Sequence, residues 1–223
     1  MRRIAKLLSL SACTVAARLP YLAEQAGAEH EQWLLKNGPF EHVQFDDLET
    51  YEHSKCKPLS VPAVVDKHSR RVLGFAVAQL PAKGHLAAIS REKYGHRADK
   101  SPQARMDLFD SLTEHISETA RFESDQHMQY PQLIKRHFPE ATHIRYASRK
   151  PAVSGQGELK KIGFDPLFAI NHVFAMLRAN VSRLIRKTWC TTKRQDRLYD
   201  HLAIFVTVFN QGYMDSNWRG AKQ

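Results

Sequence analysis

Two adjacent aspartates, Asp46 and Asp47, are the residues of this sequence best suited to chemistry. They stand in the stretch HVQFDDL, where residues 42–48 alternate between apolar and polar types and so predict a half-buried strand. A carboxylate in the middle of a strand is costly unless a cation meets it. The expected cation is a hard divalent ion, because Mg²⁺ takes oxygen ligands and is usually held by one or two carboxylates together with phosphate oxygens.

A second interpretation of the two aspartates stays open at this point. If residues 42–48 form an edge strand, both carboxylates can simply face water. Two further apolar or β-branched runs, at 61–65 and 72–80, are separated by the polar turn DKHSRR. The three runs together predict an antiparallel meander whose first strand carries the acids.

The charge balance indicates a polyanionic partner. Among 223 residues, 33 Lys and Arg stand against 23 Asp and Glu, which gives a formal net charge of +10. The surplus is concentrated at the first three residues, around 135–136, and above all between residues 178 and 197. An excess of this kind favours nucleic acid over a neutral substrate. The length allows one sizeable core and a small appendage.

The cysteine spacing and the hydropathy indicate in which cellular compartment the protein is expected. Cys13, Cys56 and Cys190 form no CxxC pair, so this chain builds neither a disulfide framework nor a zinc ribbon, and a reducing compartment is favoured. The first residues superficially resemble a signal peptide, but Lys6 interrupts the apolar stretch. No segment approaches the roughly 20 uninterrupted apolar residues that a membrane helix needs. We therefore expect a cytoplasmic, nucleoid-associated protein without membrane contact.

The amino-terminal segment, residues 1–20, predicts a helix-turn-helix. Helices are expected over 2–8 and 12–19, with Ser11 as the N-cap of the second. Such a pair would bury its apolar side chains between the helices and offer exposed positions of the second helix to the major groove. The apolar positions are Ile4, Leu7, Leu8, Leu10, Val15 and Leu19, and the exposed ones are Ala12, Thr14 and Arg18. An ordinary amphipathic helix pair would look the same.

The rest of the chain predicts an α/β domain. Residues 21–40 are expected to form a helical connector that Asn37-Gly38-Pro39 ends. The catalytic domain would span 41–210, followed by a tail over 211–223. Beyond the meander, its expected elements are a helix over 103–120, a short run at 121–125, a helix over 130–138, a strand over 143–147, a flexible loop over 150–161, a long helix from 165–166 to about 187 and a last helix over 194–209.

The order of these segments resembles a bacterial insertion-sequence transposase of the DDE type, closest to the insertion-sequence-one-like group. Three stretches carry the likeness: FDDLETYEHSK at 45–55, FESDQHMQYPQLIKRHFPEATH at 122–143 and NHVFAMLRANVSRLIRKTWCTTKR at 171–194. The resemblance covers essentially the whole chain and implies an RNase H-like catalytic domain behind a helix-turn-helix. Relatives carry a zinc ribbon ahead of that segment, which we expect this chain to lack.

The resemblance also implies the catalytic residues. The family's first aspartate falls on Asp46, with Asp47 in the place of a following acid that is not a ligand. The second falls on Asp125, and the third acidic position falls on Asn171. The three would hold Mg²⁺ or Mn²⁺, although Asn171 offers a carbonyl oxygen without charge where the nearest relatives carry glutamate.

Basic residues are expected to hold double-stranded DNA through its phosphates, which sets register without reading sequence. Arg183, Arg186 and Lys187 would share one helix face, with Arg178 about one turn back. The full set of expected DNA contacts is Arg2, Arg3, Thr14, Arg18, Arg178, Arg183, Arg186, Lys187, Lys193 and Arg194.

The leading hypothesis is therefore a transposase that binds terminal repeats and performs strand cleavage and transfer, as a homo-oligomer in its synaptic complex. An alternative is a catalytically inactive or truncated transposase that acts only as a DNA-binding protein or repressor. A third hypothesis is a host RNase H-like nuclease.

Overall fold

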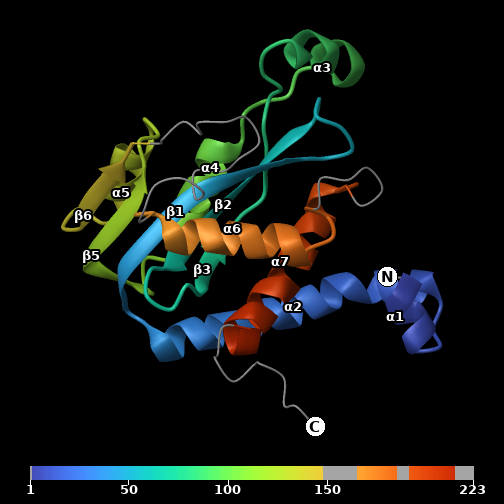
Figure 1. Ribbon diagram of the computed structural model, residues 1–223, viewed down its shortest axis with the longest axis horizontal. Helices are drawn as coiled ribbons and strands as arrows, with labels where there is room; N and C mark the ends of the chain where they lie inside the picture. The colour runs from blue at the N-terminus through green and yellow to red at the C-terminus, as the bar shows by residue number, and fades with distance from the viewer. Residues whose placement is uncertain (1, 148–164, 185–190, 214–223) are drawn as a thin grey trace.

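A mixed sheet of six strands forms the centre of the protein (Figure 1). The computed structural model describes residues 2–147, 165–184 and 191–213. The strand order is β3-β2-β1-β5-β6, and the short β4 pairs with β2 beside β3. The strands are β1 (Phe40–Tyr51), β2 (Pro58–Asp66), β3 (Val72–Phe75), β4 (Ala78–Gln79), β5 (Ile116–Asp125) and β6 (Thr142–Tyr146). The predicted α/β class with a mixed sheet and a leading antiparallel meander is confirmed.

Strand β1 lies in the middle of the sheet. It pairs antiparallel with β2, with Asp46 opposite Ala63, and it pairs parallel with β5, with Gln44 opposite Glu123. Strand β5 in turn pairs parallel with β6. The interpretation of residues 42–48 as a water-facing edge strand is therefore wrong.

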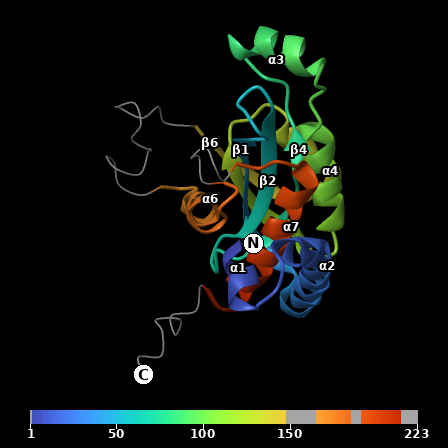
Figure 2. The same cartoon turned by 90° about the vertical axis from the view of Figure 1, so that its right-hand side faces the viewer.

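Helices cover both faces of the sheet, because β1 and β2 present apolar side chains on each side. One face packs against α6 (Phe168–Asn180) and α7 (Gln195–Val208). The other packs against α4 (Ser101–Ser111), α5 (Tyr130–His137) and the end of α2 (Ala12–Asn37). Figure 2 shows α6 and α4 on opposite sides of the strands. The remaining helices are α1 (Arg2–Leu7), α3 (Leu86–Tyr94) and a π-helical turn at Phe209–Tyr213.

The predicted helix over 103–120 is wrong in its second half. Helix α4 ends at Ser111, and β5 begins at Ile116. Ile116 continues the helical spacing of the apolar residues in α4. It is nevertheless the first residue of a strand, and it is buried in the core on the face that α4, α5 and the end of α2 cover. Parallel pairing of β5 with β1 overrides the local helical pattern here, which is how tertiary context commonly defeats propensity.

Two other boundaries differ from expectation. The predicted strand over 72–80 is divided into β3 and β4, with Ala76 and Val77 between them. The long helix expected to reach about residue 187 ends at Asn180, where Val181 turns to an extended conformation. The helices expected at 130–138 and 194–209 and the strand at 143–147 are confirmed within a residue or two.

The amino-terminal helices differ from the predicted pair. Helix α2 is a single helix of 26 residues that passes through Pro20, so the expected break between residues 19 and 21 is wrong. Ser11 is its N-cap, as predicted, and accepts a 3.0 Å hydrogen bond from the Thr14 backbone N–H. The expected apolar packing is mostly absent, because Leu7 is 83% exposed and Ile4, Leu8 and Leu10 are about half exposed or more. In the part of the chain that the structure describes, no helix is long and apolar enough to cross a membrane.

One side chain completes the edge of the sheet. Asn210 is 2% exposed and accepts a 3.0 Å bond from the Val72 N–H while it donates a 2.8 Å bond to the Val72 carbonyl. The amide thereby replaces the neighbouring strand that this residue of β3 lacks, and it ties the π-helical turn that follows α7 to the sheet.

Asn210→Ala should lower the free energy of unfolding by about 1 to 3 kcal/mol, because it leaves both backbone groups of Val72 buried without a partner. Urea unfolding followed by circular dichroism measures this change. Asn37→Ala is the matched control, since it removes an exposed bond to the Trp33 carbonyl and should cost less than about 0.5 kcal/mol. Equal losses in the two variants would contradict the role assigned to Asn210.

Candidate functional site: an acidic pair on the central strands

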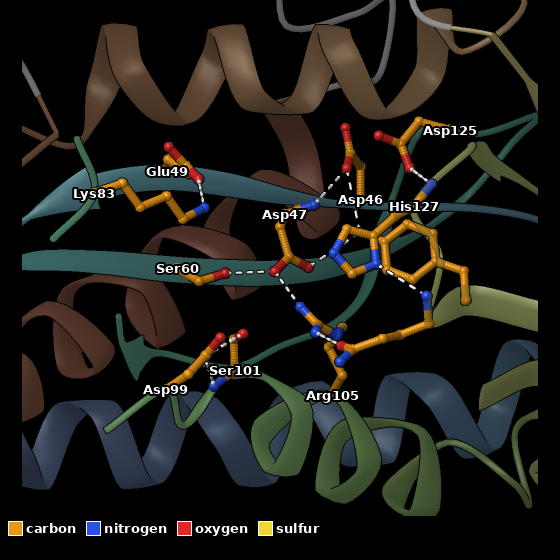
Figure 3. A network of polar contacts seen from close by, with 12 residues as sticks. Asp46, Asp47, Glu49, Ser60, Lys83, Asp99, Ser101, Arg105, Asp125 and His127 are labelled. Atoms are coloured by element: carbon orange, nitrogen blue, oxygen red, sulfur yellow. Dashed lines mark hydrogen bonds and ion pairs between the residues drawn. The ribbon is translucent and has the colours of Figure 1, made fainter. Parts of the chain in front are cut away.

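The register of β1 and β5 brings Asp46 and Asp125 together. Gln44 and Glu123 are paired across the two parallel strands. Two residues further along each strand, a side chain returns to the same face. Asp46 and Asp125 therefore occupy neighbouring positions on one face, and the charge of Asp125 acts on Asp46. Figure 3 shows the two carboxylates on the same side of β1, beside each other.

Gln44 fixes the frame around this pair. Its Nε2 donates to Glu123 Oε2 at 2.9 Å and to the Pro166 carbonyl at 2.7 Å, and its Oε1 accepts from the Ile170 N–H at 3.2 Å. Gln44 is 1% exposed. A single buried amide thus joins β1, β5 and the first turn of α6. It belongs to the residue two positions before Asp46, on the same face of β1.

Asp47 points to the opposite face of the sheet, as the next residue on a strand must. Its Oδ2 accepts a 2.6 Å bond from Arg105 Nη1 and another 2.6 Å bond from Ser60 Oγ. The Arg105 side chain is only 5% exposed. Asp47 is therefore neutralised by a buried guanidinium of α4. Its expected status as an acid that is not a ligand stays a prediction.

Arg105 also holds the loop that follows Asp125. Its Nη2 donates to Gln129 Oε1 at 2.5 Å, and its guanidinium lies 5.8 Å from the centre of the Tyr130 ring. The Tyr130 hydroxyl lies 3.3 Å from Oδ1 of both Asp46 and Asp47. Arg105 and Tyr130 consequently fix the distance between β1 and the end of β5.

The acidic residues of this region differ in the direction in which the protein shifts their pKa. Burial, together with the charges of Asp125 and Asp47, raises the pKa of Asp46 to about 7, against the lowering effect of a bond from the Asp47 N–H. Burial and the same three carboxylates raise the pKa of Tyr130, so its phenol stays protonated and donates. Burial alone would raise the pKa of Glu123, but the bonds from Lys67 and Gln44 outweigh it and lower that pKa.

The buried carboxylates differ in what compensates them. Glu123 has Lys67 at 2.7 Å and Arg121 at 3.2 Å, and Asp47 has Arg105. Among the residues that the structure describes, no Lys, Arg or His forms an ion pair with Asp46 or Asp125. The same residues contain no group of three or more His, Cys, Asp or Glu side chains arranged to hold a metal ion.

Two carboxylates without a cation are a donor set that suits Mg²⁺ or Mn²⁺. Such ions accept oxygen ligands and are commonly bound by one or two carboxylates, with phosphate oxygens and water completing the set. Asp46 and Asp125 fit this requirement, and burial together with the neighbouring carboxylates raises the pKa of Asp46, which disfavours its negative charge in the absence of a bound cation.

A cavity of about 340 Å³ opens beside the pair. Both carboxylates line it, together with side chains of strands β1 and β2, of the start of α4 and of the loop after β5. Its lining residues are Asp46, Asp47, Glu49, Ser60, Leu80, Lys83, Asp99, Ser101, Arg105, Asp125, His127, Gln129 and Tyr130. Figure 3 shows the polar network that these residues form.

Asn171, the third expected metal ligand, lies in the first half of α6 and is half-buried. Its Nδ2 donates a 2.9 Å bond to Asp165 Oδ2, and the Asp165 Oδ1 accepts from the Leu167 N–H at 3.0 Å. The amide is thereby oriented by the turn that precedes the helix. Its convergence with Asp46 and Asp125 stays a prediction.

The expected DNA contacts lie on separate elements. Arg2, Arg3, Thr14 and Arg18 are exposed on α1 and the start of α2. Arg183 follows the end of α6 in a turn, so its predicted helical alignment with Arg178 is wrong. Lys193 and Arg194 are exposed just before α7, where Arg194 pairs with Asp196. Arg186 and Lys187 lie outside the described residues.

Sequence reasoning missed the residues that support the acids, namely Arg105, Gln129, Tyr130 and Ser60. One signal was present. Arg105 has the same helical spacing as the buried Ser101, Leu108 and Phe109, which makes it a charge on the apolar face of an amphipathic helix. A charge at such a position requires a buried partner.

The chain matches no protein-family model and no curated protein. The assignment of function therefore depends on the geometry of the acidic pair, on the sheet that carries it and on the motifs of the sequence.

Arg105→Met should destabilise the protein by about 3 to 5 kcal/mol, because it leaves the carboxylate of Asp47 buried without its cation. The double variant Arg105→Met/Asp47→Asn removes both charges and should recover most of that loss. Urea unfolding of the two single variants and the double variant measures the coupling. Additive losses would show that the pair does not interact as the structure indicates.

The raised pKa of Asp46 predicts a pH dependence of stability in the absence of divalent cations. Between about pH 4 and pH 7 the folded protein keeps a proton on Asp46 that the unfolded chain has released. The free energy of unfolding should therefore fall as pH rises through this window, by up to about 1.4 kcal/mol per pH unit, and level off above it.

Asp46→Asn removes this titration. The difference in unfolding free energy between Asp46→Asn and the unaltered protein, measured in a chelator across the same window, should grow in favour of the variant as pH rises. If the unfolding free energies of the variant and of the unaltered protein change in parallel with pH, Asp46 has its ordinary pKa in the folded protein.

Proposed function

We propose that this protein is a DNA transposase of the DDE type, in which Asp46 and Asp125 hold the divalent cations needed for strand cleavage and transfer. The observation that supports the proposal most directly is the pair itself. Two carboxylates from adjacent parallel strands share one face and line a cavity, and no cation among the described residues pairs with them, whereas the neighbouring Asp47 and Glu123 are compensated.

The sheet supports an RNase H-like identity. A meander of β1, β2 and β3 is extended by two strands parallel to β1, in the order β3-β2-β1-β5-β6. The resemblance implies a first acid on the first strand and a second at the end of the fourth strand, and in this sheet Asp46 lies on β1 and Asp125 ends β5. A helix, α6, lies over the face on which both acids stand.

The proposed chemistry assigns different tasks to the residues. Asp46 and Asp125 would hold the metal, which when bound activates the attacking hydroxyl and stabilises the leaving oxygen of a phosphodiester. The protonated Tyr130 donates a hydrogen bond toward Asp46 and orients its Oδ1. Arg105 removes Asp47 from competition for the cation by pairing with it. In this proposal Asp46 and Asp125 bind the metal, while Tyr130 and Arg105 position the carboxylates without binding the metal.

A repressor without catalysis is the second candidate, and the observation that favours it is the amide at Asn171. An amide carries no charge, and here its nitrogen is bonded to Asp165. In that case the acidic pair would be a remnant, and the excess of positive charge would still bind DNA.

The proposed partner is double-stranded DNA, both the ends of the element and its target, with a homo-oligomer in the synaptic complex. The net charge of +10 supports a polyanionic partner. A nucleoid-associated, cytoplasmic location follows from that partner as part of the same proposal.

Cleavage of DNA that carries the sequences flanking the gene tests the proposal. With Mg²⁺ or Mn²⁺, the unaltered protein should nick this DNA, and Asp46→Asn and Asp125→Asn should reduce the rate by a factor of about 10³ or more, since each loses a charged ligand. Glu41→Gln is the control and should keep the rate, because it removes the same single negative charge from an exposed side chain of the same strand, β1.

The same assay decides the role of Asn171. Asn171→Ala should abolish cleavage and Asn171→Glu should retain or raise it, by supplying a charged oxygen ligand. Full activity in Asn171→Ala would remove this residue from the site. An unaltered protein that never cleaves, together with activity gained in Asn171→Glu, would instead establish the repressor.

A further inference from the structure

A basic lobe projects from one end of the sheet. We define it as residues 52–57, the tip of the hairpin between β1 and β2, together with residues 82–100, which contain α3. Figures 1 and 2 show α3 at the far end of the molecule, next to this hairpin. The lobe carries seven Lys and Arg residues against three acidic ones, a net charge of +4, and three histidines.

The lobe contributes little to the core. Ser90 is the only buried residue of α3, and the helix exposes Ile89 and Tyr94. A helix that buries one serine gains little stability from apolar burial. What the helix offers is its surface, on which Arg91 and Lys93 are exposed.

Polar contacts nevertheless fix the lobe in place. Ser90 Oγ donates a 2.6 Å bond to the Cys56 carbonyl, and Lys57 Nζ lies 5.5 Å from the centre of the Tyr94 ring. At the base, the Lys100 N–H donates to the Gln79 carbonyl at 3.1 Å. The helix and the hairpin tip therefore present their charges as one rigid surface, which reduces the entropy lost when a ligand binds.

The charges of this surface are available to a ligand. Lys55, Arg91 and Lys93 are exposed, and none of them forms an ion pair within the described ranges. Lys57 is the exception on the hairpin tip, because it pairs with Glu52 at 2.9 Å.

The lobe is continuous with the acidic pair. Its residues Lys83 and Asp99 line the same cavity as Asp46 and Asp125. From Asp46, strand β1 runs five residues further to Tyr51, directly before the hairpin tip, a span of about 16 Å at roughly 3.3 Å per residue. Duplex DNA has a persistence length of about 150 base pairs, so a duplex that lies along β1 from the acidic pair must pass over the lobe within roughly five base pairs.

We propose that the basic lobe binds the phosphate backbone of double-stranded DNA next to the acidic pair and holds it in register there. The inference rests on the proposed function for the identity of the ligand. It adds a contact surface, Lys55, Arg91 and Lys93, that lies apart from the amino-terminal helices and from the residues around 178–194. Phosphate contacts of this kind fix position without reading sequence.

The test measures binding of duplex DNA of arbitrary sequence as a function of salt. The variant Lys55→Gln/Arg91→Gln/Lys93→Gln should lower the slope of log affinity against log salt concentration by about 3, because each lost phosphate contact releases about one counterion fewer. The matched control is Lys36→Gln/Lys135→Gln/Arg136→Gln, which removes the same charges from exposed positions on α2 and α5. Its slope should change by less than about 1.

A charge-conserving variant, Lys55→Arg/Arg91→Lys/Lys93→Arg, should keep the slope of the unaltered protein and shows that the loss is one of charge and not of folding. Equal slopes in the lobe variant and the unaltered protein would overturn the inference. So would a lobe variant that loses binding to phosphatidylserine vesicles while its binding to DNA is unchanged, since the ligand would then be a membrane surface.

Cleavage in the same proteins separates this inference from the proposed function. A lobe variant with weakened DNA binding, beside an unaltered protein that does not cleave, supports the lobe and rejects the enzyme. Unchanged binding in the lobe variant, beside cleavage that depends on Asp46, rejects the lobe and supports the enzyme.

Discussion

Two consecutive carboxylates on the central strand are the constraint on which the arrangement of this protein depends. A strand sends Asp46 and Asp47 to opposite faces of the sheet, and each face is covered by helices. Burying an ionised carboxylate without a partner is costly, so each face must supply a solution. On the face of Asp47 the solution is Arg105, held by a 2.6 Å bond. On the face of Asp46 the described residues supply no cation, and the negative charge is left to an outside partner.

The first solution shapes the second. Because Arg105 bonds both Asp47 and Gln129, the guanidinium ties β1 to the loop that begins directly after Asp125. Gln44 performs the corresponding task on the other face, where it joins β1, β5 and α6. The two acids of the pair are thus placed by residues that the proposed function does not assign to the metal. A buried ion pair that contributes little net stability can still be required for position.

The strands and their acids could be predicted because their signals are local. The alternation around Asp46 and the run that ends at Asp125 are readable from a few residues, and the meander follows from its polar turns. The start of β5 could not be predicted in this way, since Ile116 also fits the helical spacing of α4 and only its pairing beside β1 decides the outcome. Arg105 and Tyr130 were missed for the same reason. Their partners lie 58 and 84 residues away along the chain. The helical spacing of Arg105 indicates that it needs a buried partner, but no local pattern identifies which residue that partner is.

The same constraint explains why a basic surface belongs next to an acidic site. Under the proposed function, a phosphodiester that approaches Asp46 and Asp125 would meet negative charge, and bound cations would offset this repulsion only at the site itself. Screening limits the reach of surface charges to about 8 to 10 Å at physiological ionic strength, so cations elsewhere on the protein contribute little at the moment of docking. Positive charge must therefore stand within a few base pairs of the pair. Within the lobe, Lys83 lines the cavity beside the pair, whereas the hairpin tip lies about 16 Å further along β1 at roughly 3.3 Å per residue. The exposed cations of the tip and of α3 would therefore act on the phosphates that lie over them and not on the one at the pair.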